Sequence, residues 1–284
     1  MAEDIIGGYR LGKLLGNGQT SQVFEVIEQT SHRHFAMKIL TGKNVQSSDA
    51  RAALFHEAAV GIEMAHPNVI KIISVDKSKV HPHYIMEYFP AGSLKARQMR
   101  KEFDFLKTNM GKILKQCATG LAYMNASGWV HRDVKPDNFL INAAVELRII
   151  DFALARRVEK DNFLTRFFRR KATVQGTRSY MSPEQIRAEP LDGRADIYSF
   201  GATIYELTCN RPPFRGSSNS DLLQKHCSEK PLPPQNHNPD LTDDFSRFVL
   251  KMLEKKPEAR YESFHEVLIA LKKIRIFKSI ALES

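Results

Sequence analysis

A run of polar residues at 131–138 could carry out proton and phosphoryl chemistry. The segment HRDVKPDN lies between two apolar stretches, where polar side chains need partners or a chemical role. Asp133 can accept a hydroxyl proton, Lys135 can neutralise a phosphoryl oxygen, and Asn138 can offer an amide oxygen to Mg²⁺. A plain polar turn is the alternative, and so dense a set of polar residues disfavours it.

A second oxygen ligand follows at Asp151, thirteen residues after Asn138. Asp151 closes the apolar, strand-like run LRIID, so its carboxylate is expected at the edge of a site. A lone Asp in such a place is usually a cap or a turn. Together with Asn138, however, it would supply the hard oxygen ligands that Mg²⁺ prefers.

Lys38 and Glu57 are candidates for an ion pair. Lys38 lies in the apolar run at 35–40, where a charged side chain is unfavourable unless its ammonium group reaches an anion or extends to solvent. Glu57 lies on a predicted amphipathic helix and can supply the partner carboxylate. Such a pair could position phosphate groups.

Two glycines could bring a backbone close to those phosphates. Gly16 and Gly18 lie between two predicted strands, where a chain without Cβ atoms can turn sharply. An ordinary hairpin turn is the alternative. Ser21 stands at the third glycine position of G-x-G-x-x-G, and a loop between two strands argues against a dinucleotide fold, which needs a strand followed by a helix.

The elements that would position these residues divide the chain into two parts. Residues 9–74 contain short β-rich runs and one helical stretch at 48–64, which predicts a small sheet with one helix packed on it. Beyond Glu87, apolar residues at helical spacing predict long helices around 110–124 and 197–207. The last twenty residues predict a final helix with a basic face. The pattern is typical of an α+β protein.

Composition excludes several classes of function. With 284 residues, of which 42% are hydrophobic and 26% charged, the chain can bury substantial cores. It has no apolar run long enough to span a bilayer, and its start lacks the order of a secretory signal. The cysteines are widely spaced and form no CxxC pair, which fits a reducing cytoplasm. Despite the net charge of +10, the only dense basic run is 166–171, so we expect no nucleic-acid partner.

Nine motifs in order give the chain a resemblance to protein kinases from Tyr9 to about Ile274. They are GNGQTSQV, AMKI, HEA followed by HPN, MEY, HRDVKPDN, DFA, SPE, DIYSFG and PEAR. The resemblance implies a two-lobed protein kinase fold, with an antiparallel-sheet N-lobe carrying one helix at 9–86, a hinge at 87–91, a mainly helical C-lobe at 92–274 and a tail at 275–284. ATP is expected in the cleft between the lobes.

The resemblance also implies a role for each residue that matches a motif of the family. The ATP-binding residues would be Gly16 and Gly18 over the phosphates, Val23, Ala36 and Leu140 around the adenine, Lys38 on the α- and β-phosphates with Glu57 fixing it, Met86 as gatekeeper, and Glu87, Tyr88 and Phe89 as backbone partners of adenine. The catalytic and framework residues would be Asp133 as base, Lys135 on the γ-phosphate, Asn138 and Asp151 on Mg²⁺, with Mn²⁺ as an alternative cation, the pair Glu184 and Arg260, and Asp196 as anchor of the catalytic loop.

Lys135 further implies that the acceptors are serine and threonine, because Ser/Thr kinases of the family carry lysine two residues after the catalytic aspartate. Thr177 agrees with this, and GTRSYMSPEQ and DGRADIYSFG look most like bacterial Ser/Thr kinases of the eukaryotic type. The implied function is transfer of the γ-phosphoryl group of ATP to proteins. A pseudokinase scaffold is the alternative, disfavoured by the presence of Lys38, Asp133 and Asp151. The SPE segment disfavours a small-molecule kinase.

Regulation is implied by Arg132, because kinases with arginine before the catalytic aspartate commonly need a phosphate on the activation segment. Thr173, three residues before Gly176, is the first candidate and Thr165 the second, with self-association for autophosphorylation; a plain loop threonine is the alternative. Many bacterial relatives continue into a membrane span. The chain is therefore expected to be either a complete cytoplasmic protein or the cytoplasmic domain of a longer, membrane-anchored one.

Three positions depart from the family pattern. Ser21 replaces a glycine but leaves its N–H available, so ATP binding should survive. Gly61 stands where the family often has a larger apolar residue between the helix and Phe152, so a gap is expected that would loosen the helix. Ala153 replaces the glycine after Asp-Phe and should resist a positive φ, which restricts the flip of Phe152.

Overall fold

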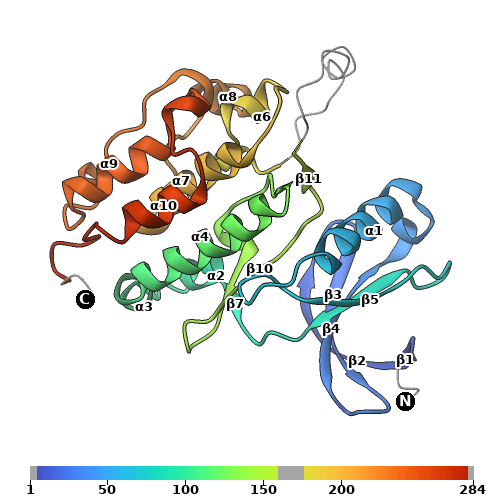
Figure 1. Cartoon of the computed structure of the whole chain (residues 1–284). Coiled ribbons are helices and arrows are strands. Elements are labelled where there is room, and N and C mark those ends of the chain that lie inside the picture. The colour runs from blue at the N-terminus through green and yellow to red at the C-terminus, as the bar shows by residue number, and fades with distance from the viewer. Residues whose placement is uncertain (1–4, 159–175, 281–284) are drawn as a thin grey trace. The chain divides into compact units, whose positions relative to one another are not determined.

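The computed structural model describes residues 5–158 and 176–280, and the chain divides into two compact units (Figure 1). Unit 1 comprises residues 1–91 and 150–153, and unit 2 comprises residues 92–149 and 154–284. Unit 1 is built around a sheet and unit 2 is mainly helical. The predicted α+β class, with a small antiparallel sheet and a larger helical part, is confirmed.

Unit 1 contains a six-stranded antiparallel sheet in the order β1-β2-β3-β4-β6-β5, with α1 against it. The serine before α1, Ser47, accepts a hydrogen bond from Ala50 N and so caps the helix, as serine commonly does at this position. The elements are β1 Ile5–Ile6, β2 Tyr9–Asn17, β3 Ser21–Glu28, β4 His34–Leu40, η1 Gly42–Gln46, α1 Ser48–Ile62, β5 Ile72–Asp76 and β6 His83–Glu87.

The two faces of this sheet have different roles, because side chains alternate along a strand. One face forms an apolar core of Val26, Phe35, Met37, Ile39 and Ile85. The strand register pairs Val23 with Lys38, Lys38 with Tyr84, and Ala36 with Met86, so these five side chains share the opposite face. The sheet therefore gathers four residues with predicted roles, Val23, Ala36, Lys38 and Met86, on one side.

Unit 2 is organised around α4 and α7, which match the predicted apolar stripes. α7 is buried along nearly its whole length, and a Cβ atom on Gly201 would come within 2.8 Å of Met252 Cβ, so α9 packs closely against it. The elements are β7 Gly92–Ser93, α2 Leu94–Met99, α3 Phe103–Thr108, α4 Met110–Ala126, β8 Trp129–Val130, η2 Pro136–Asn138, β9 Phe139–Ile141, β10 Leu147–Ile149, β11 Arg156–Arg157, η4 Arg178–Tyr180, α6 Pro183–Ile186, α7 Gly193–Cys209, α8 Asn219–Ser228, η5 Pro234–Asn236, α9 Asp243–Met252, η6 Pro257–Ala259 and α10 Phe264–Leu271.

Short strands hold the polar run 131–138 in place. β8 ends at Val130 and pairs with β11, while β9 follows the run directly and pairs with β10 and β7. The run itself has no regular structure except η2. Its polar side chains therefore project from an irregular segment that is fixed at both ends.

The prediction of a helix over the last twenty residues is wrong at residues 272–280, because α10 ends at Leu271. Phe277 is buried and forms an antiparallel bridge with Leu241, and Lys278 N donates to Asp240 O at 2.7 Å. Burial of Phe277 in this extended pairing replaces the helical continuation that the apolar spacing suggested.

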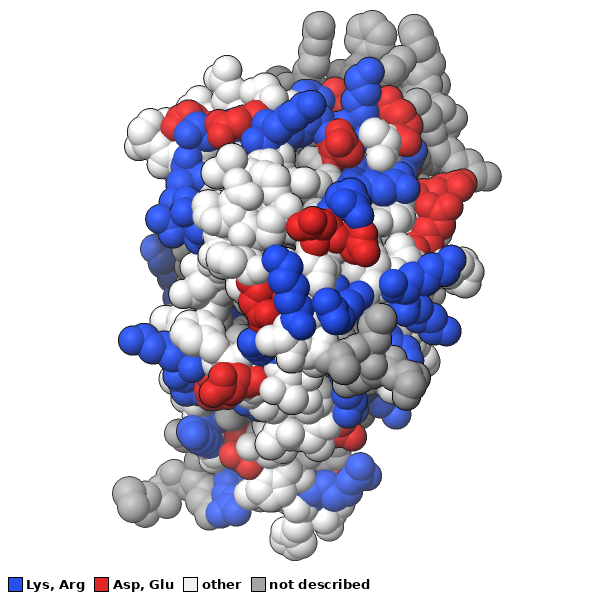
Figure 2. Space-filling model, turned by 90° about the vertical axis from the view of Figure 1, so that its left-hand side faces the viewer, with Lys and Arg blue, Asp and Glu red and all other residues white. Residues whose placement is uncertain are grey.

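The surface charges and the helix compositions of the folded chain bear on its possible partners. On the face shown in Figure 2, Lys and Arg side chains are interspersed with Asp and Glu, so the positive charges of that face are not gathered in one patch. None of the helices within 5–158 and 176–280 combines the length and the apolar character that a bilayer crossing requires.

Candidate active site

The ammonium group of Lys38 in unit 1 is held by Glu57 of α1. Lys38 Nζ lies 2.8 Å from Glu57 Oε1 and 2.7 Å from Oε2, and the Tyr84 hydroxyl donates to Glu57 Oε1 at 2.9 Å. Glu57 and Tyr84 are buried, while the Lys38 side chain is 19% exposed. The pair thus fixes a cation whose remaining N–H donor can reach a ligand.

Electrostatics keep Lys38 charged. Burial alone would lower the pKa of Lys38, but the negative charges of Glu57 and Asp151 raise it above its ordinary value. Asp151 follows β10 in sequence and belongs to unit 1. The arrangement suits the binding of an anion, because a permanent cation stands at the edge of a largely buried polar cluster.

The expected gap at Gly61 is filled from within unit 1, so that prediction is wrong. A Cβ atom on Gly61 would lie 2.3 Å from Ile72 Cδ1, 2.7 Å from Ile72 Cγ1 and 3.1 Å from Phe152 Cε2. The side chain of Ile72, on β5, therefore occupies the space that a larger residue at 61 would take. In this structure α1 is therefore not loosened, and it holds Glu57 in the ion pair with Lys38.

Of the two glycines predicted to lie between strands, only Gly18 lies in the turn between β2 and β3, whereas Gly16 lies on β2 opposite Val23. Gly18 N donates to Ser21 O at 2.9 Å, and a Cβ atom on Gly18 would approach the same oxygen to 3.1 Å. At Gly16 the nearest atoms to such a Cβ are those of Val23, at 3.8 Å and beyond. Space for a side chain is therefore tighter at Gly18 than at Gly16.

Backbone groups at the end of β6 are partly engaged. Glu87 N donates to Lys71 O at 2.9 Å, and Phe89 O accepts from Ala91 N at 2.8 Å. The N–H of Glu87 is thus engaged, whereas a carbonyl oxygen has two lone pairs and can accept more than one hydrogen bond. Tyr88 stacks at a tilt on His34, with ring centroids 6.0 Å apart. In unit 2, Leu140 lies on β9 opposite Arg148 and Ser93.

Asp133, Lys135 and Thr177 form a compact polar cluster in unit 2. Lys135 Nζ donates to Asp133 Oδ2 at 2.6 Å and to Thr177 Oγ1 at 2.8 Å. Thr177 N and its hydroxyl both donate to Asp133 Oδ1 at 3.1 Å. Gly176, with φ of 122°, makes the turn that delivers Thr177, and a conformation of this kind favours glycine.

The charge state of Asp133 follows from these contacts. Burial by itself would raise the pKa of Asp133, but the charge and hydrogen bond of Lys135, the charge of His131 and the Thr177 N–H together lower it below its ordinary value. The Asp133 carboxylate is therefore ionised at neutral pH and can accept a proton.

Asp196, at the start of the buried helix α7, anchors the backbone that carries Asp133. Its carboxylate accepts from His131 N at 2.8 Å, Arg132 N at 2.9 Å and Asn125 Nδ2 at 3.1 Å. Arg132 has a φ of 69°, an uncommon conformation for a residue with a side chain, and these bonds hold it there.

The oxygen ligands predicted for a cation lie in different units. In unit 2, Asn138 Nδ2 donates to Asp133 O at 2.9 Å and to Oδ2 at 3.2 Å, so its amide oxygen is the atom it can offer. In unit 1, Asp151 has a φ of 68°, while Ala153 has no positive φ. Amide and carboxylate oxygens fit a hard divalent cation. Among residues 5–158 and 176–280, no group of three His, Cys, Asp or Glu side chains suitable for a metal is found.

The predicted pair of Glu184 and Arg260 is present and buried in unit 2. Arg260 Nη1 and Nη2 donate to Glu184 Oε1 and Oε2 at 2.6 and 2.9 Å. The guanidinium also donates to the carbonyls of Glu254, Arg194 and Lys255, which satisfies its remaining N–H groups. Such complete bonding is what a buried ion pair requires.

Arg132 lies beside a second guanidinium. Burial lowers the pKa of Arg132, and the positive charge of Arg156 lowers it further, with Asp196 offsetting only part of the effect. The Arg132 Nε atom is buried without a hydrogen-bond partner in the part of the chain that the structure describes. Two adjacent cations of this kind would be stabilised by an anion. The threonines predicted to supply one, Thr173 and Thr165, lie outside the described residues.

Sequence reasoning missed two contributors to these clusters. One is Tyr84, whose hydroxyl supports Glu57; the signal was a tyrosine inside a buried strand, where a hydroxyl needs a partner. The other is a polar chain that links Tyr180 and Lys95 to Glu206 of α7. Lys95 and Glu206 are far apart in sequence and neither stands in a motif, so no pattern pointed to their pairing.

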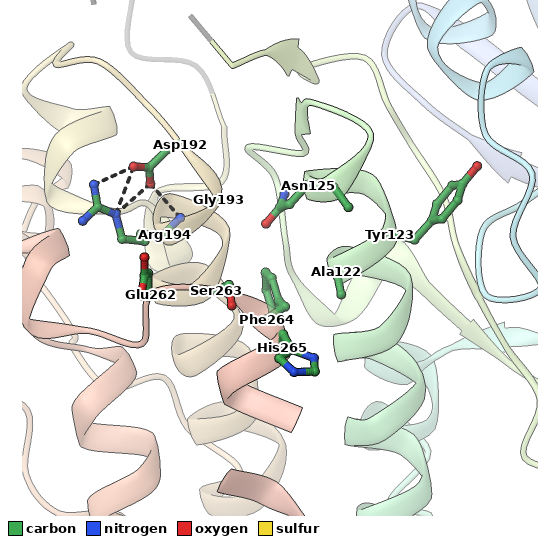
Figure 3. Close-up of a pocket in the computed structure, with 11 residues that line it drawn as sticks. Ala122, Tyr123, Asn125, Asp192, Gly193, Arg194, Glu262, Ser263, Phe264 and His265 are labelled. Carbon is green, nitrogen blue, oxygen red and sulfur yellow. Dashed lines mark hydrogen bonds and ion pairs between the residues drawn. The ribbon is translucent and has the colours of Figure 1, made fainter. Parts of the chain in front are cut away.

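A hollow of about 770 Å³ in unit 2 contains none of the predicted site residues. The end of α4, the start of α7 and the start of α10 line it, and Figure 3 shows Asp192 and Arg194 bonded to each other at one side. Asp192 caps α7 through Arg194 N. The residues that line the hollow thus belong to the junction of α4, α7 and α10.

The chain is similar to known proteins over most of its length. The family model described as "Protein kinase domain" matches residues 9–270. The chain is 30% identical over 263 residues to the serine/threonine-protein kinase PknB of Mycobacterium leprae, covering 91% of this chain and 42% of that protein. It is 30% identical over 272 residues to a probable serine/threonine-protein kinase of Streptomyces coelicolor, covering 93% and 39%. For one of Clostridium acetobutylicum, the identity is 28% over 270 residues, covering 94% and 40%. The chain thus spans about two fifths of the length of these relatives.

Proposed function

Because the chain belongs to the protein kinase family, we propose that it transfers the γ-phosphoryl group of ATP to serine and threonine hydroxyls of proteins. The observation that carries this proposal is the ionised Asp133 carboxylate, bonded to both Lys135 and Thr177. The names of the relatives as serine/threonine-protein kinases support the same acceptor class. No feature of the described residues favours the pseudokinase alternative.

In the proposed reaction, Asp133 orients the acceptor hydroxyl and takes its proton. The acceptor oxygen forms a bond to the γ-phosphorus, and the bond from that phosphorus to the β-γ bridging oxygen breaks, leaving ADP. Lys135 neutralises charge on the γ-phosphoryl oxygens. Positioning and charge neutralisation carry most of the catalysis, because phosphoryl transfer needs little covalent chemistry from the protein.

For the nucleotide, we assign the anchoring role to Lys38, which the Glu57 carboxylate and the Tyr84 hydroxyl support. Lys38 would bind the α- and β-phosphates under the backbone of the glycine turn. The adenine would lie against apolar side chains and bond to the Glu87 carbonyl and to the backbone as far as Phe89. The proposed side-chain contacts of the adenine are Val23, Ala36 and Leu140, with Met86 as gatekeeper and Tyr88 among the backbone partners.

Members of this family use ATP and a divalent cation. The residues that would hold the cation here are Asn138 and Asp151, through an amide and a carboxylate oxygen, and both Mg²⁺ and Mn²⁺ accept such ligands. When bound, the cation would neutralise phosphate charge.

Regulation by phosphorylation is proposed at Thr173, with Thr165 second. The adjacent guanidinium groups of Arg132 and Arg156 support it, since a phosphate there would offset their mutual repulsion. Transfer between two copies of the chain would require transient self-association. The three free cysteines fit the proposed cytoplasmic location.

The test is phosphorylation of a serine/threonine peptide library and of the protein itself with Mg-ATP and with Mn-ATP, followed by mapping of the modified residues. Asp133→Asn should lower the rate by about 10² to 10⁴, the range for loss of a general base. Asp104→Asn, the same substitution at an exposed position on α3, should change nothing. Equal rates in the wild type and Asp133→Asn would refute the enzyme assignment.

A further inference from the structure

Glu206 of α7 is a buried carboxylate with two side-chain partners. The Tyr180 hydroxyl donates to Glu206 Oε2 at 2.5 Å, and Lys95 Nζ lies 2.5 Å from Oε1. The Glu206 side chain is 6% exposed and that of Lys95 is 34% exposed. Lys95 therefore stands between this carboxylate and solvent.

This cluster is linked to the residue proposed as base. Tyr180 N donates to Thr177 O at 3.0 Å, and Thr177 donates through both N and Oγ1 to Asp133. Burial and Glu206 are the main reasons that the pKa of Tyr180 is raised, and the charges of Asp137 and Asp133 add to the effect. Glu206 thus lies beside the segment that flanks the hydroxyl-accepting group.

A peptide whose hydroxyl reaches Asp133 must continue past this segment. An extended chain advances about 3.3 Å per residue, so residues a few positions from the acceptor come near Tyr180 and its partners. A carboxylate that faced such a residue would favour lysine or arginine, because a charge-assisted bond in a partly buried setting is strong. Here the ammonium group of Lys95 already supplies that bond.

The position of Lys95 on α2 keeps its side chain next to Glu206. Lys95 lies in the first turn of α2, whose Ser93 cap accepts from Ala96 N. The same helix is tied to α7, since Gln98 Nε2 donates to Glu206 O at 2.9 Å. Because α2 is fixed to the backbone of Glu206 itself, the Lys95 side chain is held at the carboxylate.

We propose that Lys95 takes the place at Glu206 that a basic substrate residue would otherwise occupy, so that the enzyme prefers acceptors with neutral or acidic neighbours. This inference rests on the proposed kinase function. It makes Lys95 a specificity-determining residue through charge neutralisation of Glu206, and it names the substrate class as peptides without lysine or arginine near the acceptor.

The experiment compares serine peptides that carry arginine or glutamine at one position at a time, within four residues of the acceptor. The measured quantity is the ratio of kcat/KM for the arginine peptide to that for the glutamine peptide. It is independent of the fraction of folded enzyme, so partial unfolding of a variant does not affect it. For the wild type we expect a ratio at or below one at every position.

Lys95→Met should raise this ratio by about tenfold at one or two positions, mainly through a lower KM, because Glu206 becomes available to the arginine. Adding Glu206→Gln to Lys95→Met should return the ratio to the wild-type value. Lys115→Met, which removes the same charge at an exposed position of α4, should leave the ratio unchanged. Lys95→Gln also removes the positive charge from Glu206, and it replaces Lys95→Met if that variant does not fold.

Two results would overturn the inference while leaving the kinase assignment intact. One is a wild-type preference for arginine peptides, and the other is an unchanged ratio in both Lys95 variants. Absence of peptide phosphorylation by the wild type would instead overturn the proposed function together with this inference.

Discussion

His226 on α8 shows how burial changes the chemistry of a single residue. Its Nδ1 atom lies 3.0 Å from the Tyr198 hydroxyl, and its ring packs edge-on against Phe214 with centroids 4.9 Å apart. Burial lowers the pKa of His226 to about 3, and the nearby charge of Lys255 contributes. The imidazole is therefore neutral in the folded protein throughout the usual pH range.

This depressed pKa predicts a pH dependence of stability. The unfolded chain binds a proton at His226 near pH 6.5 and the folded chain only near pH 3, so protonation favours unfolding between these values. Between pH 7.5 and 5.5, this group should lower the free energy of unfolding by roughly 1.4 kcal/mol. Well above pH 6.5 its contribution vanishes, because the histidine is then neutral in both states.

Denaturant unfolding at pH 7.5 and 5.5 gives the change in the free energy of unfolding for the wild type and for His226→Gln. The difference between these two changes is the contribution of His226. His265→Gln, at an exposed position of α10, should keep the wild-type dependence. If His226→Gln kept it as well, the histidine would have to be accessible to protons in the folded state.

At the scale of elements, α1 and β5 fit together because residue 61 has no side chain. Ile72 fills the space beside Gly61, and Phe152, the neighbour of Asp151, also borders that space. The contact of helix and strand is thus set by one glycine and one isoleucine, and both must change together if either changes.

Gly61→Ala should destabilise the protein by about 1–3 kcal/mol, the usual effect of overpacking, and should raise the KM for ATP because α1 carries Glu57. Ile72→Ala alone should also destabilise by leaving a cavity, but the double variant should lose less than the sum, since the alanine methyl enters the vacated space. Thermal and denaturant unfolding of all three variants gives this coupling.

Gly111→Ala is the matched control, because a Cβ atom at Gly111 on α4 would have nothing within 4 Å. It should be neutral or slightly stabilising, as alanine is a better helix former than glycine. Additive effects of Gly61→Ala and Ile72→Ala would contradict the proposed packing.

At the scale of the whole chain, the pair of Glu184 and Arg260 joins segments 76 residues apart within unit 2. Because both side chains are buried, Glu184→Gln should cost about 3–5 kcal/mol by leaving the guanidinium without its counter-charge. Arg247→Met, which removes an exposed pair with Asp244, should cost less than about 1 kcal/mol. Similar losses in the two variants, measured by denaturant unfolding, would show that the buried pair carries no special stability.

How far the sequence predicts the molecule depends on the range of the interactions. The stripe on α4 and the apolar run on β4 are local patterns, so these elements were predictable. The filling of Gly61 by Ile72, the bridge of Leu241 to Phe277 and the pairing of Lys95 with Glu206 depend on contacts between distant segments. Periodicity carries no information on such contacts, which is why the gap and the terminal helix were predicted wrongly and the Lys95 pairing was missed.

The backbone at the end of β6 has a consequence for the design of competitive inhibitors. The Glu87 N–H is bonded to Lys71 O at 2.9 Å, so a heteroaromatic compound gains little from an acceptor atom directed at that nitrogen. A donor on the compound can instead be directed at the Glu87 carbonyl, because a carbonyl oxygen has two lone pairs and can accept more than one hydrogen bond. Inhibitor series for this protein should therefore begin from scaffolds that present an amino group to Glu87.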